Sequence, residues 1–214
     1  MDLVEAMTTT GTCRYYRPDP VPDEVLERAF AAARFAPQGA NVQPVRWVVV
    51  RKATLRRALA DLYAPLWRDY LADLRGRFPR LGPLPRPLAD ADHFATHLSH
   101  VPVILVCCVR LDRVLATDAE LGRLSIVGGA SVYPFVQNLC LALRAEGVGT
   151  AITTLLCRRE DEVRRLLEIP DDLATACHVA AGYPARPWPR RLRRMPVSET
   201  VFAERFGAPL TESV

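Results

Sequence analysis

The sequence has little lysine and few aromatic residues. Lys52 is the only lysine, aromatic residues make up 7% of the chain, and 28 basic against 24 acidic residues give a net charge of +4. The arginines alternate with Asp and Glu along expected helices, which is typical of solvated surfaces. Because no basic stripe with interleaved aromatic residues occurs, we expect no nucleic-acid partner.

The sequence also lacks long apolar runs and paired cysteine motifs. No run of about eighteen uncharged apolar residues occurs, so we expect no membrane span. The first residues are acidic and differ from a secretory signal, so we expect a cytoplasmic protein. The six cysteines form no C-x-x-C pair and lie mostly in apolar runs, which favours buried free thiols. Cys107 and Cys108, as neighbours in a strand, should point to opposite faces.

Several catalytic motifs are absent. The sequence contains no glycine-rich phosphate loop, which argues against a dinucleotide-binding reading of its strands, and no G-x-S-x-G serine motif. His93, His97 and His100 would lie within about 60° of one another on a helix. They could bind zinc, but no H-E-x-x-H glutamate accompanies them, so surface or interface histidines are favoured over a metal site. His178, in an apolar strand, is interpreted as a core histidine with satisfied hydrogen bonds.

Helices and strands both contribute to a single expected domain over residues 1–214. The apolar periodicity predicts helices at residues 23–35, 54–75, 129–146 and 160–167, with Pro134 a candidate kink in the third. Buried strands are predicted at residues 45–50, 101–109, 149–155 and 176–181. Residues 78–88 are proline-rich and predicted to be non-helical, either a lid over a site or a plain surface loop.

The most informative segment is a short turn in front of the first strand. Residues 36–44 read A-P-Q-G-A-N-V-Q-P and continue into the apolar run at 45–50. Asn and Gln side chains each carry a donor pair and an acceptor. Such groups suit the edge of a flat heterocycle, on which donors and acceptors alternate, and a flavin pyrimidine ring has such an edge.

This turn resembles the A-P-S-x-x-N-x-Q-P-W motif of the FMN-dependent nitroreductase family. Pro37, Gly39, Asn41 and Gln43 match the motif, whereas Gln38 replaces its serine. The resemblance implies that these five residues belong to the cofactor site, either of their own subunit or of the partner subunit.

Three further segments resemble the same family, in the family's order. Residues 8–16 resemble R-R-S-x-R-x-F, with Thr12 and Arg14 matching, and with Thr10 and Gly11 at positions that are basic in the family. Residues 147–155 resemble the G-L-G-x-x-x-T-T strand beside the flavin ring, which implies contacts from Thr153, Thr154 and Leu155. Residues 193–199 resemble R-x-P-[LV]-x-E, which implies that Arg194, aided by Arg193, binds the FMN phosphate.

The resemblance implies an α+β nitroreductase-like fold with a central mixed sheet flanked by helices. It also implies an intertwined homodimer in which residues 186–214 pack on the partner subunit. The apolar segment 129–146 looks larger than the core of a monomer requires, which also favours a dimer.

The implied activity is an FMN-dependent oxidoreductase that passes a hydride from NAD(P)H through flavin N5 to a small organic acceptor such as a nitroaromatic or a quinone. The flavin, rather than a catalytic side chain, would carry the chemistry. Two alternatives stay open: an FMN-dependent dehydrogenase, oxidase, dehalogenase or flavin-fragmenting enzyme on the same fold, and a non-catalytic flavin-binding or partner-binding module. The acceptor pocket would depend on residues 63–90. The residues do not distinguish NADH from NADPH.

Overall fold

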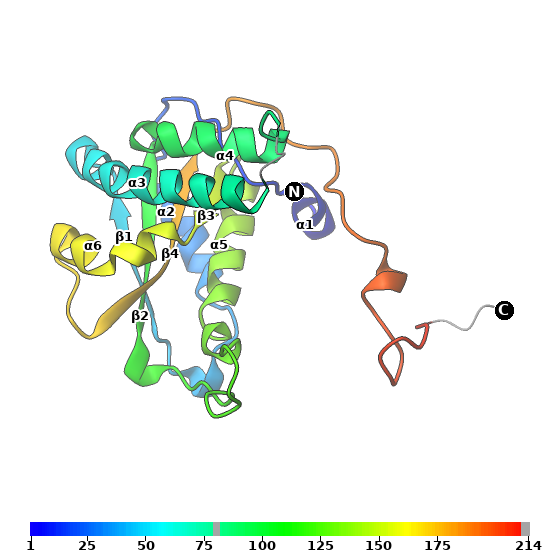
Figure 1. The fold of residues 1–214 in the computed structure, drawn as a ribbon. Coiled ribbons are helices and arrows are strands. Elements are labelled where there is room, and N and C mark those ends of the chain that lie inside the picture. Colours follow the sequence, from blue (N-terminus) through cyan, green and yellow to red (C-terminus); the bar gives the residue numbers. More distant parts are fainter. Residues whose placement is uncertain (79–81, 211–214) are drawn as a thin grey trace.

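The computed structural model describes residues 1–78 and 82–210, which fold around one four-stranded sheet (Figure 1). The helices are α1 (Leu3–Thr9), α2 (Asp23–Ala33), α3 (Ala53–Arg77), α4 (Arg86–Thr96), α5 (Tyr133–Ala145) and α6 (Glu160–Leu167). The strands are β1 (Val45–Val50), β2 (Val103–Arg110), β3 (Gly149–Thr153) and β4 (Leu173–Gly182). No helix in the described part of the chain has both the length and the apolar character needed to cross a membrane.

The strand order is β1-β2-β4-β3, and each neighbouring pair is antiparallel. The expectation of a mixed sheet was therefore wrong for the described strands. Two neighbouring strands pair in parallel when a crossover, usually a single helix, carries the chain back to the end of the sheet where the first strand began. However, two helices, α3 and α4, separate β1 from β2. Strands β2 and β3, joined through α5, do run in the same direction, but β4 lies between them and pairs antiparallel with both.

Helices cover both faces of the sheet, so the central strand β2 is buried along almost its whole length. One face packs against α2 and α5, and the other against α3, α4 and α6. Cys107 belongs to the first apolar cluster and Cys108 to the second, which confirms the prediction that they face opposite sides. All six cysteines are free thiols, four of them buried.

The element boundaries differ from the sequence prediction mainly where proline occurs. Pro134 lies in the first turn of α5, where its missing N–H has no helical partner to lose, and it does not kink the helix. Likewise Pro87 lies in the first turn of α4, so residues 86–88 are helical rather than part of the predicted loop. Residues 79–81 of that loop lie outside the described residues. Helix α1, which Asp2 caps through hydrogen bonds from two backbone N–H groups, was not predicted.

His178 lies in the core as predicted, but its hydrogen bonds are not satisfied. The residue is 1% exposed in β4. Neither ring nitrogen has a hydrogen-bond partner among the described residues. Burial therefore lowers the pKa of His178 to about 4, because a charged imidazole has lost its water without gaining a partner.

This burial predicts that the folded state loses stability in mild acid. The folded pKa lies below the ordinary value, so acid protonates His178 in the unfolded state first, and the loss begins as the pH falls through about 6.5 and continues toward about 4. We expect the free energy of unfolding to fall by about 2 kcal/mol between pH 8 and pH 5 through this residue alone. In His178→Leu, urea denaturation should show that this part of the pH dependence is gone. An unchanged pH dependence in the variant would contradict the assignment.

Candidate functional site

The N-terminal segment of residues 11–16 lies against the outer edge of β3. The Cys13 N–H donates a 2.8 Å hydrogen bond to the Thr150 carbonyl. This approach requires glycine at the start of the strand, since a Cβ on Gly149 would lie 2.7 Å from the Cβ of Cys13 and 2.8 Å from its Sγ. The G-x-G pattern of the sequence therefore has a steric reason at Gly149.

Beyond this contact the edge of β3 is open. Backbone polar groups of a strand alternate between its two sides. Because the Thr150 carbonyl points outward to Cys13, the N–H and C=O of Ile152 also point outward. Neither group has a backbone hydrogen-bond partner within the described ranges. A flat ligand at this edge would find one free donor and one free acceptor.

A cavity of about 520 Å³, called here the β3 cavity, lies beside this open edge. Aromatic side chains from α3 and α4 form its apolar wall, and Thr12 and Arg14 provide its polar rim. The Thr153 hydroxyl donates to the Tyr63 hydroxyl at 3.3 Å. The lining residues are Thr12, Arg14, Tyr63, Trp67, Tyr70, Pro87, Leu88, Ala91, Phe94, Ala151, Ile152, Thr153, Thr154 and Leu155.

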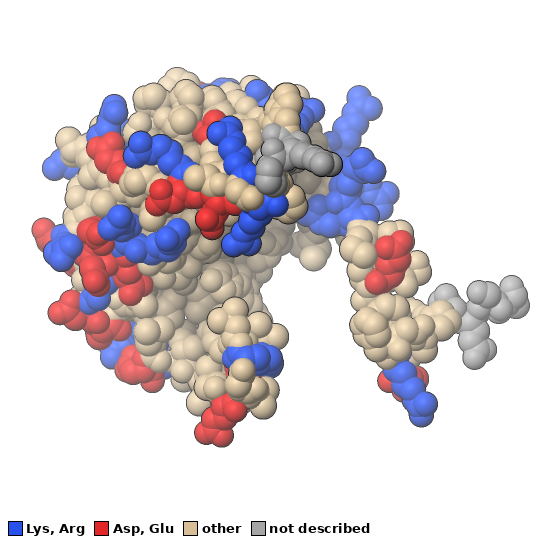
Figure 2. Space-filling model, viewed as in Figure 1, with Lys and Arg blue, Asp and Glu red and all other residues tan. Residues whose placement is uncertain are grey.

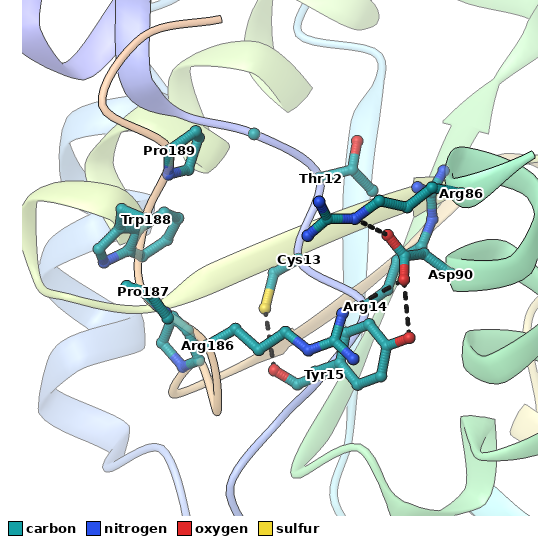
Figure 3. A pocket seen from close by; sticks show the side chains of 12 residues that line it. Thr12, Cys13, Arg14, Tyr15, Arg86, Asp90, Arg186, Pro187, Trp188 and Pro189 are labelled. Carbon is teal, nitrogen blue, oxygen red and sulfur yellow. Dashed lines mark hydrogen bonds and ion pairs between the residues drawn. The ribbon is translucent and has the colours of Figure 1, made fainter.

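A second cavity of about 380 Å³, called here the arginine cavity, adjoins the first. Figure 3 shows that the segment 11–15, the beginning of α4 and the segment 184–189 form its walls. Thr12 and Arg14 line both cavities, so one extended ligand could occupy the two.

The amide turn is locally strained. Ala40, Asn41 and Gln43 have φ values of 47°, 53° and 48°, a left-handed conformation that is unfavourable for residues other than glycine. The Gly39 N–H donates to the Ser131 Oγ at 3.1 Å, which ties the turn to the segment before α5. That segment is itself held by the buried carboxylate of Asp118, which accepts hydrogen bonds from the Ser125 hydroxyl and the Ile126 N–H. The Oε1 atom of Gln38 is buried and has no partner among the described residues.

Within one chain the amide turn and the β3 cavity lie apart. The turn precedes β1 at one edge of the sheet, whereas β3 forms the other edge. Three strand spacings separate these edges, which is about 14 Å. The register places Thr153 level with Val48, three residues beyond the start of β1. The five residues of the turn, Pro37, Gln38, Gly39, Asn41 and Gln43, therefore line neither cavity.

The remaining predicted residues divide into two groups. Gly11 lines the arginine cavity, whereas the Thr10 hydroxyl donates to the Ala6 carbonyl of its own helix. Arg193 and Arg194 lie outside both cavities at the start of a C-terminal arm, residues 193–210, which leaves the body of the molecule (Figure 1). Figure 2 shows basic side chains gathered where this arm departs, and exposed arginines of the sequence occur there: Arg190, Arg191, Arg193 and Arg194.

Two of the three clustered histidines, His93 and His97, stack on one another, whereas His100 is tilted against His97. No group of three or more His, Cys, Asp or Glu residues in the described part of the chain could hold a metal ion. His93 lies in α4, but His97 caps that helix and His100 follows it in a short 3-10 turn, so they share no regular helix face. The ring of His93 stacks on those of Tyr15 and His97 at centroid distances of 4.1 and 4.0 Å.

The family of this chain follows from a comparison with known families, because the model of the Nitroreductase family matches residues 8–183. This chain belongs to the nitroreductase family. That result confirms the predicted family, and the matched range includes the β3 cavity and the amide turn.

Individual relatives agree with this assignment. A protein named NADH dehydrogenase from Thermus thermophilus is 29% identical over 193 residues, which cover 86% of this chain and 88% of the relative. A 5,6-dimethylbenzimidazole synthase from Rhodospirillum rubrum is 27% identical over 178 residues, covering 82% and 79% of the two chains. The structure of an NADPH:FMN oxidoreductase from Vibrio harveyi, solved with NAD+, has a TM-score of 0.68 at 18% identity, covering 95% of this chain and 77% of that one. The nitroreductase-like α+β fold is thereby confirmed.

The motifs did not point to the aromatic wall of the β3 cavity. Tyr63, Trp67 and Phe94 come from α3 and α4, whose periodic apolar residues indicate core packing. The expectation that residues 63–90 form an acceptor pocket included Tyr63 and Trp67 but not Phe94. The Trp67 indole N–H donates to Asp92 at 2.7 Å, a link between the two helices that the sequence does not reveal.

The contact between Gly149 and Cys13 gives a test of the site. We expect Gly149→Ala to push residues 11–16 away from β3 and to lower the free energy of unfolding by about 1–3 kcal/mol through overpacking. A matched control is Gly76→Ala in α3, where a Cβ would meet nothing within 4 Å. That change should stabilise the helix by about 0.5–1 kcal/mol. Urea denaturation of both variants checks the opposite signs, and equal effects would contradict the steric role of Gly149.

Proposed function

We propose that this nitroreductase-family chain is an FMN-dependent NAD(P)H oxidoreductase that reduces a small organic acceptor. The observation that carries the proposal is the β3 cavity: an aromatic wall, an arginine on the rim and an open strand edge with a free donor and acceptor. The names of its relatives, an NADH dehydrogenase and an NADPH:FMN oxidoreductase, support the same class of reaction.

The residues present suit a flavin. The apolar wall fits a flat ring, and the outward N–H and C=O of Ile152 suit its polar edge. Thr12, Arg14, Thr153, Thr154 and Leu155 would hold the flavin in this cavity. When bound, FMN would supply the chemistry of accepting a hydride and passing two electrons on.

The chain itself contributes charge and shape. Arg14 places a positive charge on the rim of the cavity, which favours a gain of negative charge there. Burial raises the pKa of Tyr63, so its hydroxyl keeps its proton at neutral pH and remains a hydrogen-bonding group. Tyr63 and Thr153 are therefore the hydroxyls that would orient a ligand against the aromatic wall.

A second candidate function is fragmentation of the flavin itself. The similarity to a 5,6-dimethylbenzimidazole synthase over 82% of this chain favours this alternative. An assay that follows NAD(P)H oxidation with quinone and nitroaromatic acceptors distinguishes the two. Sustained turnover supports the oxidoreductase, whereas consumption of the flavin without an added acceptor supports fragmentation.

The cofactor assignment predicts saturable binding of FMN. We expect fluorescence titration to reach about one flavin per chain, and Arg14→Ala to weaken binding of FMN and riboflavin alike by about ten- to a hundredfold, since a charge-assisted hydrogen bond contributes about 1.5–3 kcal/mol. The control Arg113→Ala changes an exposed arginine that lines neither cavity. Absence of binding at micromolar FMN would refute the proposal.

We further propose that the chain acts as a homodimer whose sites combine residues of two subunits. The apolar segment 129–146 does not favour a dimer, because α5 buries Phe135, Leu139 and Leu143 in the core of its own chain. Two other observations support a second copy. The amide turn lies across the sheet from the β3 cavity, and the C-terminal arm exposes apolar side chains along its length: Met195, Val197, Val201, Phe206 and Leu210.

Among the described residues, backbone hydrogen bonds tie the chain to the body just before the arm begins and not along the arm. The Leu192 N–H donates to the Thr8 carbonyl at 2.8 Å, and the later backbone hydrogen bonds within the described arm join arm residues to each other. Phe206 is 94% exposed. Exposed apolar side chains on an extended arm indicate a surface that another chain covers, and an arm of this kind would wrap the partner subunit.

This proposal predicts a large effect from one exposed residue. Burying a Phe side chain contributes about 1.5–3 kcal/mol, and a twofold interface contains each contact twice. We expect Phe206→Asp to weaken dimerisation by at least about a hundredfold in analytical ultracentrifugation. The control Arg205→Gln, on the same turn, removes no apolar side chain and should have little effect. A wild-type monomer, or a Phe206→Asp dimer of unchanged affinity, would contradict the role of the arm.

A further inference from the structure

The arginine cavity carries more positive charge than its own contacts require. Arg14, Arg86 and Arg186 line it together with a single carboxylate, Asp90 (Figure 3). Three guanidinium groups against one carboxylate leave a formal excess of two positive charges. Like charges repel one another in a concave site unless an anion is bound there.

Tyr15 and Asp90 hold two of the arginines in place. The guanidinium carbon of Arg186 lies 3.2 Å from the centroid of the Tyr15 ring. The Tyr15 hydroxyl donates to Asp90 at 2.7 Å, and Arg186 donates to the same carboxylate oxygen at 3.3 Å. The other oxygen of Asp90 lies 4.0 Å from Nε of Arg86. The carboxylate thus orients Arg186 and Arg86 without neutralising both.

Asp90 holds the two arginines in place as an ionised carboxylate, and its single negative charge offsets only one of their positive charges. Its hydrogen bond from Tyr15, together with the nearby arginines, lowers the pKa of Asp90. The first turn of α4, which carries Arg86, contains no acidic residue. The helix dipole therefore adds to the attraction for an anion at this end of the cavity.

Backbone hydrogen bonds fix the two chain segments that enclose the cavity. The Arg17 N–H donates to the Tyr183 carbonyl and the Ala185 N–H donates to the Tyr15 carbonyl, at 2.8 and 2.9 Å. Further along, the guanidinium carbon of Arg144 lies 3.9 Å from the centroid of the Trp188 ring. Because both segments are held on either side of the opening, the cavity is formed before a ligand arrives.

We propose that the arginine cavity binds a phosphoryl group, with Arg86 and Arg186 as its principal donors. Planar guanidinium forks match phosphate oxygens, and a phosphomonoester carries about −1.5 to −2 charges at neutral pH. The proposal rests on the proposed function, because the shared residues Thr12 and Arg14 connect this cavity to the β3 cavity. Arg86 and Arg186 would thereby replace the two basic residues of the family motif, whose positions Thr10 and Gly11 occupy in this chain. Arg193 and Arg194 lie outside the cavity.

Two phosphoryl sources are compatible with this chemistry: the phosphate of FMN and a phosphate of the nicotinamide dinucleotide. The variants Arg86→Gln and Arg186→Gln distinguish them, with Arg113→Gln as a control outside both cavities. The side chain of Arg86 is 86% exposed, so its replacement leaves the folded core intact. Dissociation constants for FMN, riboflavin and NADP+ are measured by fluorescence in each protein.

If FMN is the source, each glutamine variant should bind FMN about tenfold more weakly or worse, while riboflavin affinity changes less than about twofold. If the dinucleotide is the source, NADP+ affinity should fall by a similar factor while both flavins are unaffected. Either pattern supports the phosphoryl site. Unchanged affinities for all three ligands, or equal losses for FMN and riboflavin with NADP+ unaffected, would overturn it.

Calorimetric titration with inorganic pyrophosphate alone separates this inference from the cofactor assignment. Wild-type protein that binds pyrophosphate, with binding lost in the Arg86→Gln and Arg186→Gln double variant, supports the anion site even if no flavin binds. If the wild-type protein binds riboflavin, does not bind pyrophosphate and binds FMN no more tightly than riboflavin, the flavin site in the β3 cavity is retained and the phosphoryl site is overturned.

Discussion

The contact between Cys13 and Gly149 holds the candidate site together. The N-terminal segment reaches the edge of β3 only because Gly149 has no side chain, and the resulting hydrogen bond to Thr150 satisfies one outward carbonyl of the strand. The segment then turns away and leaves the outward backbone groups of Ile152 without a backbone partner in the part of the chain that the structure describes. Both cavities follow from this geometry, because Thr12 and Arg14 flank Cys13 and line each of them.

The sheet supplies the rigid base for this arrangement. Strands β2 and β4 are covered on both faces, and β4 fixes the position of β3 through five register pairs, from Gly149 to Thr153. An edge strand normally exposes unpaired backbone groups, which proteins cover or use for binding. In this chain the N-terminal segment covers the first part of the edge, and the open remainder faces a cavity with an aromatic wall.

Polar atoms and apolar side chains that lack partners among the described residues lie at several places in the molecule. The strained amide turn keeps the Gln38 Oε1 buried without a partner in the described ranges, and the amides of Asn41 and Gln43 lie at the surface. The arm presents apolar side chains away from the body. Together with the excess arginine charge, these features are the basis of the proposals of a cofactor site and of a second subunit.

The sequence by itself determined the local elements and the family. An apolar run predicted β1 with its full bounds. The apolar pattern also predicted α6 with its full bounds, and α2 and α3 within about two residues, because periodicity indicates which face of a helix is buried. It also identified Thr12, Arg14, Thr153, Thr154 and Leu155, which the structure brings together in one cavity. Only the tertiary structure decided the antiparallel pairing, the unsatisfied environment of His178 and the convergence of Arg86 and Arg186 on Tyr15 and Asp90. Those depend on contacts between segments as far apart as residues 90 and 186, and no local pattern encodes which distant segment a side chain will meet.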